Sequence, residues 1–228
     1  MIADKKTFSL GLILLVTFSA VLVAIFMPLM HGQNGLQYLD HLYNSISKGS
    51  ANYIPKAARA VESVAGQQIE VTLHMASPQQ AEQTARLFST GGAQVSAADA
   101  ALKVSGDLGP ILSNSLEDAG FMYANNAAAV QTKYGYEARR VLYNWWLACT
   151  AMEEALNKQE NFKQAALVHT VITKALEPAY NYYGIEPQNI RERLGVVIFS
   201  LIFYVVYTLW YGFGIMYLFE GWGMRLEH

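Results

Sequence analysis

Two long apolar runs are the clearest feature of the hydrophobic pattern. Residues 8–30 contain no charged side chain, and neither do residues 194–219. A helix crosses the hydrocarbon of a bilayer with about 20 apolar residues, and both runs are longer than that. The pattern therefore predicts two transmembrane helices, over residues 8–30 and 194–219, with a folded domain over residues 31–193 between them.

The first part of this domain has the spacing of a helix. Leu36, Leu39 and Ile46 recur at three- to four-residue or seven-residue intervals, and the pattern resumes at Val61 after an interruption at Pro55. We therefore expect residues 36–64 to be helical.

The middle of the domain changes to a period of two. Ile69, Val71 and Leu73 alternate with polar residues, which is typical of a half-buried strand. A helix over residues 79–89 and two short strands, at 94–96 and 101–105, are expected to follow, and Asp107 is placed to cap a second helix. Residues 69–123 thus predict a small βαββα layer, and the fold class is α+β and mostly helical.

The remainder of the domain, residues 127–184, predicts a helical hairpin. One helix covers residues 136–157, a second covers residues 161–176, and the short connection between them makes the two antiparallel neighbours. Pro187 suits the first position of a last helix. An unbroken helix from Pro187 to Phe219 would couple the domain rigidly to the second apolar run.

Composition agrees with membrane insertion and excludes some functions. The chain is 53% hydrophobic and 15% charged, whereas soluble domains carry about 25% charged residues. The net charge is −2, and no basic stripe indicates nucleic acid as a partner. A single cysteine, Cys149, excludes an internal disulfide.

Orientation is predicted from the charges beside the first apolar run. Lys5 and Lys6 favour a cytoplasmic N-terminus, and the run is too long for the core of a cleaved signal peptide. The short tails, 1–7 and 220–228, are then cytoplasmic, and residues 31–193 lie on the periplasmic or extracellular side. This plan is similar to that of two-span proteins of the bacterial inner membrane, an architectural similarity that implies no function.

No constellation of catalytic residues or metal ligands is evident. The histidines form no ligand pair at a known spacing, and we expect His169 to be a core histidine. The neighbouring carboxylates Glu117 and Asp118 do not face each other on a helix, so they are expected on the solvated surface. Cys149 is expected to be a small buried hydrophobe. We predict no metal and no cofactor, and the protein is not expected to be an enzyme.

The second apolar run carries a candidate binding face. Tyr204, Tyr207 and Tyr211 recur at helical spacing, and a phenolic hydroxyl inside hydrocarbon needs a hydrogen-bond partner. Small residues that permit close helix packing lie nearby and in the first run, namely Gly212, Gly214, Ala20 and Ala24. The two helices either pair with each other through this face, or the face binds another membrane subunit or a hydrophobic cofactor that such a subunit holds.

Aromatic residues also suggest a pocket in the outer domain. Trp145 and Trp146 lie together, and three tyrosines, Tyr180, Tyr182 and Tyr183, crowd before Gly184. The three tyrosines form either the aromatic belt of a membrane interface or the wall of a pocket or partner surface, and the two tryptophans would line the same pocket.

These features predict a non-catalytic accessory or scaffolding subunit of a larger membrane complex. Its partners would be the lipid bilayer and other membrane subunits, or further copies of itself. The alternative is a membrane-anchored sensor or ligand-binding module that signals through a partner.

Overall fold

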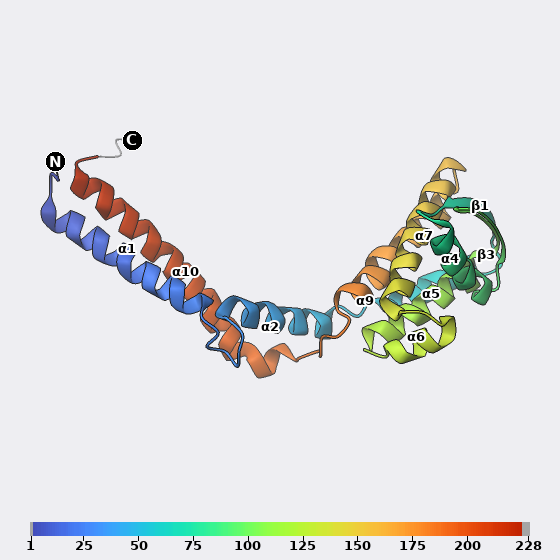
Figure 1. The fold of residues 1–228 in the computed structure, drawn as a ribbon, viewed down its shortest axis with the longest axis horizontal. Coiled ribbons are helices and arrows are strands. Elements are labelled where there is room, and N and C mark those ends of the chain that lie inside the picture. Colours follow the sequence, from blue (N-terminus) through green and yellow to red (C-terminus); the bar gives the residue numbers. More distant parts are fainter. Residues whose placement is uncertain (1, 225–228) are drawn as a thin grey trace. The chain divides into compact units, whose positions relative to one another are not determined.

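The computed structural model describes residues 2–224, which divide into two compact units (Figure 1). The first unit comprises residues 1–46 and 187–228, and the second comprises residues 47–186. Parts of the two predicted tails, residues 1 and 225–228, lie outside the described residues. As predicted, the chain is mostly helical and contains a small antiparallel sheet of three strands. Each unit is described by itself.

The first unit is built on two long apolar helices, α1 (Lys5–Phe26) and α10 (Ile190–Trp222). Both are long and apolar enough to cross a membrane. They lie side by side and antiparallel in Figure 1. Residues 35–46 of α2 (Gly35–Ser50) belong to the same unit, and the Tyr43 hydroxyl lies 2.7 Å from Ser200 Oγ on α10.

The prediction of an unbroken helix from Pro187 is wrong at its start. Asn189 has extended backbone and its side chain accepts a hydrogen bond from the Arg191 N–H, so Asn189 is the N-cap and α10 begins at Ile190. Residues 185–189 are not helical. The helix that contains the second apolar run therefore does not extend back to Pro187.

Glycines allow α1 and α10 to approach closely. A methyl group added at Gly11 would overlap the Leu218 backbone, and one added at Gly221 would overlap the Phe8 backbone. The Ala3 and Asp4 N–H groups both donate to the Gly221 carbonyl at 3.0 Å. The two backbones are therefore in direct contact at the end of the pair that carries the N-terminus.

The second unit contains the sheet and the main hydrophobic core. The strands are β1 (Gln68–His74), β2 (Gln94–Ala98) and β3 (Ala101–Asp107), in the order β1-β3-β2. Helices α4 (Pro78–Thr90) and α5 (Leu108–Tyr123) complete the predicted βαββα order. Alternate residues of β1 are buried and exposed, which confirms the predicted half-buried strand. A further helix, α3 (Ile54–Val61), precedes a short 3₁₀ turn (Glu62–Val64).

Helices complete the second unit after Asn126. They are α6 (Ala127–Tyr134), α7 (Ala138–Lys158), α8 (Phe162–Val171) and α9 (Glu177–Asn181). Helices α7 and α8 pack together as the expected hairpin. The second predicted helix departs from α geometry, since Ile172–Leu176 form a π-helical turn. Pro178 follows it and has no N–H to donate to the preceding turn, which accounts for the departure.

We predict that Gly11→Ala separates α1 from α10. The added methyl meets backbone rather than a movable side chain, and overpacking of this kind costs about 1–3 kcal/mol. Disulfide cross-linking between Phe8→Cys and Trp222→Cys, whose native rings lie 6.2 Å apart, should fall several-fold. Gly212→Ala is the control, because a methyl there meets open space and should leave the cross-linking unchanged.

Candidate functional site

A buried carboxylate lies at the centre of the second unit. Asp118 on α5 has no exposed surface. Its oxygens accept hydrogen bonds from the Tyr134 hydroxyl at 2.7 Å, from Trp145 Nε1 at 2.7 Å and from Lys133 Nζ at 2.8 Å. The expectation that Asp118 lies on the solvated surface is wrong, because three donors from α6 and α7 supply what water would have supplied. Glu117, its neighbour, is exposed as expected.

The pKa values of Tyr134 and Lys133 in this cluster are both raised. Burial, with help from the nearby Asp118 carboxylate, raises the pKa of Tyr134 well above its usual range. Burial alone would lower the pKa of Lys133, but hydrogen bonds to Asp118 and Glu117 outweigh it and raise that pKa. A tyrosine that stays neutral and a lysine that stays charged at neutral pH are suited to structure rather than to proton transfer.

The second unit also contains a buried cation, Lys48. Lys48, near the end of α2, donates to Asn125 Oδ1 at 2.8 Å and to the carbonyl oxygens of Tyr182 and Ile185 at 3.0 and 2.6 Å. The Tyr123 hydroxyl donates to the Lys48 carbonyl. All three ammonium protons are therefore used, two of them to hold residues 182–185 in place.

The surroundings of Lys48 indicate a structural role. Burial lowers the pKa of Lys48, and the nearby Glu186 carboxylate opposes that shift. Asn125 supports the same segment, since its amide donates to the Ile185 carbonyl at 3.1 Å and its side-chain oxygen accepts from the Gly184 N–H at 2.9 Å.

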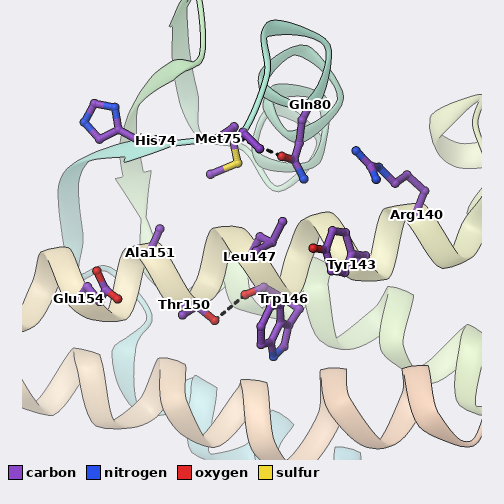
Figure 2. A pocket seen from close by; sticks show the side chains of 11 residues that line it. His74, Met75, Gln80, Arg140, Tyr143, Trp146, Leu147, Thr150, Ala151 and Glu154 are labelled. Carbon is purple, nitrogen blue, oxygen red and sulfur yellow. Dashed lines mark hydrogen bonds between the residues drawn. The ribbon is translucent and has the colours of Figure 1, made fainter.

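A prominent hollow of the second unit is an open groove of about 540 Å³ beside α7 (Figure 2). The end of β1 and the start of α4 border it on the other side. Its floor and walls combine apolar, aromatic and charged side chains, which are His74, Met75, Ala76, Gln80, Arg140, Tyr143, Trp146, Leu147, Thr150, Ala151 and Glu154. The volume is within the range of small-ligand sites.

Two side chains give this groove an aromatic wall. The rings of Tyr143 and Trp146 stack with centroids 6.1 Å apart, and the Arg140 guanidinium lies over the Tyr143 ring at 5.6 Å. Gln80 is fixed by its neighbours, because its Nε2 donates to Asn144 Oδ1 at 3.0 Å and its Oε1 accepts from the Ala76 N–H at 3.1 Å. The groove is thus preformed on one side by a polar network.

The five aromatic residues that the sequence grouped do not all line one pocket. Trp145 is in the core, with its ring 5.4 Å from that of Phe88, whereas Trp146 lines the groove. Tyr180 lines a smaller hollow of about 300 Å³, which Trp146 also borders. Tyr182 packs edge-on against Tyr123. Tyr183 lies under the Arg139 guanidinium, at 5.3 Å.

The tyrosines of α10 have different surroundings. Tyr207 donates to the Phe18 carbonyl on α1 at 3.0 Å and stacks on the Phe18 ring at 4.2 Å. Tyr211 also lies beside that ring, at 5.2 Å. Tyr204 is 70% exposed, and its hydroxyl has no hydrogen bond within residues 2–224.

The small residues near these tyrosines also differ in their contacts. Gly214 is buried against Leu15 of α1, whereas Gly212 faces open space. Ala20 and Ala24 are exposed on α1. The glycine of α1 that contacts α10 is Gly11, which the sequence pattern did not single out.

The remaining reactive side chains form no evident centre. No group of three or more metal-ligating side chains occurs in the described part of the chain. Cys149 is buried, and burial raises the pKa of its thiol to about 12. The expectation of a core position for His169 is wrong, since it is exposed and lies 3.2 Å from Glu153.

Comparisons with protein-family models, curated proteins and solved structures give no match, so the function is inferred from the residues of this chain.

We predict that Asp118→Asn lowers the free energy of unfolding by about 3–5 kcal/mol, because it leaves the buried side of Lys133 without its counter-charge. Urea unfolding followed by tryptophan fluorescence measures this. Glu117→Gln is the matched control, since it removes the exposed half of the same lysine contact and should cost about 0.2–1 kcal/mol. Equal losses in the two variants would contradict the central role of Asp118.

Proposed function

We propose that this protein is a non-catalytic accessory subunit of a larger membrane protein complex. In this proposal α1 and α10 form a transmembrane anchor, and one face of α10 binds another membrane subunit. The observation that carries the proposal concerns Tyr204, in the middle of the apolar stretch of α10. Its hydroxyl has no hydrogen-bond partner within residues 2–224.

The surface of the two apolar helices supports membrane insertion. Only 6% of the most apolar window of each helix is buried inside the structure. The core helix of a soluble protein would be mostly buried, and a soluble monomer rarely has an apolar patch larger than a few hundred Å². Lipid is the environment in which this surface is stable without a further covering.

Tyr204 has a requirement that lipid alone does not satisfy. It lies within about 4 Å, along the helix axis, of the middle of the charge-free stretch 194–219. Half of the hydrocarbon core is about 15 Å thick, so a hydroxyl at this depth finds no water. Thr17 and Thr208 avoid the same penalty by donating to carbonyls of their own helices. We therefore infer that the Tyr204 hydroxyl donates to an acceptor on another polypeptide.

Tyr204 and Tyr207 differ in what satisfies their hydroxyls. Tyr207 donates to α1, so pairing of the two helices already accounts for its hydroxyl. Pairing of α1 with α10 leaves Tyr204 exposed and therefore does not explain it. The part of the tyrosine face that we assign to a partner is thus Tyr204 and the apolar residues beside it.

A second candidate function is a membrane-anchored ligand-binding module that signals through a partner. The groove beside α7 favours it, because it combines a preformed polar network with an aromatic wall. The two functions are compatible, since an accessory subunit can bind a ligand or a peptide through its outer unit.

We also propose that residues 31–193 lie outside the cytoplasm. Lys5 and Lys6 support this orientation, because positive residues beside a first span are retained on the cytoplasmic side.

We predict that Tyr204→Phe reduces recovery of the partner subunit several-fold after gentle detergent extraction. The substitution removes one hydroxyl and keeps the ring, and a hydrogen bond between helices in a membrane contributes about 0.6–1.7 kcal/mol. Quantitative mass spectrometry of the affinity-purified complex measures recovery.

Tyr207→Phe is the matched control for this prediction. It removes the same group from the same helix, but the lost bond is internal to the α1–α10 pair. Recovery of the partner should therefore remain near that of the native chain. Recovery that is unaffected by Tyr204→Phe, or equally affected by both variants, would contradict the partner face.

For the orientation, we expect a protease added to intact spheroplasts to cleave within residues 31–193. Suitable sites are exposed on the second unit, for example at Arg59 and Lys163. Immunoblotting against tags at either end detects the fragments. Protection until the cells are lysed would show that the domain is cytoplasmic.

A further inference from the structure

We propose that the groove beside α7 binds an extended peptide segment, which adds as a fourth strand to the free edge of β1. The segment would carry an acidic residue at the Arg140 end of the groove and a basic residue at the Glu154 end. The groove and this edge both belong to the second unit, so the proposal does not rest on the membrane partner proposed above.

One edge of β1 is free for pairing. The sheet order places β1 beside β3 only. The Leu108 N–H donates to the Gln67 carbonyl at 2.9 Å and the Met75 N–H donates to the Ala100 carbonyl at 2.8 Å, so the odd-numbered residues of this segment bond toward β3. In an antiparallel ladder the residues between them direct their backbone groups the other way. The N–H and C=O groups of residues 72 and 74 therefore face the open edge.

One hydrogen bond from outside the sheet reaches this edge within residues 2–224. Gln159, just after α7, donates from Nε2 to the Glu70 carbonyl at 2.9 Å. Thr72 and His74 are exposed, and no hydrogen bond from outside the sheet reaches their backbone groups within residues 2–224. Edge groups without a hydrogen-bond partner are a template for an added strand. The free part of the edge ends at His74, which is where the groove begins.

The groove continues the line of this edge along α7. Gln159 donates a hydrogen bond to Glu70, and Glu154 lines the groove together with His74. The later residue of the α7 segment thus lies beside the earlier residue of β1, so α7 and β1 run in opposite directions. In Figure 2 the groove residues follow α7 from Glu154 to Arg140. The distance between these two charged positions along the helix axis is about 21 Å. An extended chain covers that length with about six residues.

Charge complementarity identifies the occupant. Arg140 and Glu154 are both exposed, and neither has an oppositely charged partner in the described part of the chain. A guanidinium at one end and a carboxylate at the other fit a segment with one acidic and one basic side chain. Leu147 and the Tyr143–Trp146 pair provide apolar contact between the two charges.

The direction of β1 sets the order of the two charges. Antiparallel pairs outnumber parallel pairs about two- to three-fold. A segment antiparallel to β1 runs in the same direction as α7, that is, from Arg140 toward Glu154. The acidic residue therefore comes first, and the basic residue follows about six positions later.

A displayed library of random nine-residue peptides tests the inference on the full chain in nanodiscs, with empty nanodiscs for counter-selection. We expect enrichment of sequences with Asp or Glu about six positions before Lys or Arg. The double variant Arg140→Glu with Glu154→Lys should enrich the opposite order. The control Arg139→Glu should select the same peptides as the native chain, because Arg139 lies outside the groove. No enrichment, or the same charge order in the double variant, would overturn the proposal.

The strand addition is tested separately with an enriched peptide. Hydrogen exchange of the Thr72 and His74 amides should slow at least ten-fold when the peptide binds. Thr72→Pro should abolish binding and keep the fold, because its N–H faces away from β3 and an edge strand tolerates proline there. Binding without amide protection would contradict an added strand. Protection that grows with protein concentration in the absence of peptide would assign the edge to a second copy of the chain and overturn the proposed occupant.

Discussion

The apolar surface of α1 and α10 is the constraint on which the rest of the molecule depends. The pair forms a narrow contact through Gly11, Gly214 and Gly221, and the wide remaining surface of both helices is uncovered. Burial of apolar area contributes about 25 cal/mol per Å², so an uncovered area of this size requires lipid or protein around it. A polar atom on that surface needs a hydrogen-bond partner, which lipid does not supply. The Tyr204 hydroxyl is such an atom, because it is exposed among the apolar side chains of α10.

The second unit meets its own polar requirements internally. Asp118 and Lys48 are both buried, and each is surrounded by the hydrogen-bond partners that its charge demands. No buried side-chain nitrogen or oxygen within residues 2–224 lacks a partner. Within the second unit, unpartnered groups are instead found on surfaces, for example at the edge of β1 and among the charges of the groove. The unit therefore presents these groups from a well-ordered interior, which is the preorganisation that a functional site requires.

Periodicity predicted the elements of this fold better than it predicted the site. The alternation in β1 and the helical spacing of α7 come from one buried face each, and both were predictable. Asp118 was misplaced because its three donors lie up to 27 positions away, where spacing within a helix carries no information. The same limit hid the groove, whose residues come from β1, α4 and α7 and the loop between the first two. Trp145 and Trp146 are adjacent in sequence, but about 100° of helical rotation sends one into the core and the other to the surface.

The most direct test of the central claim is the mass of the native particle that a mild detergent releases from the membrane. We expect that the chain, of 25.3 kDa, is released in fixed ratio with at least one different polypeptide. Native mass spectrometry resolves that ratio even when the identity of the partner is unknown. Release of the chain alone, or in a particle made only of its own copies, would contradict its assignment as an accessory subunit of a larger membrane complex.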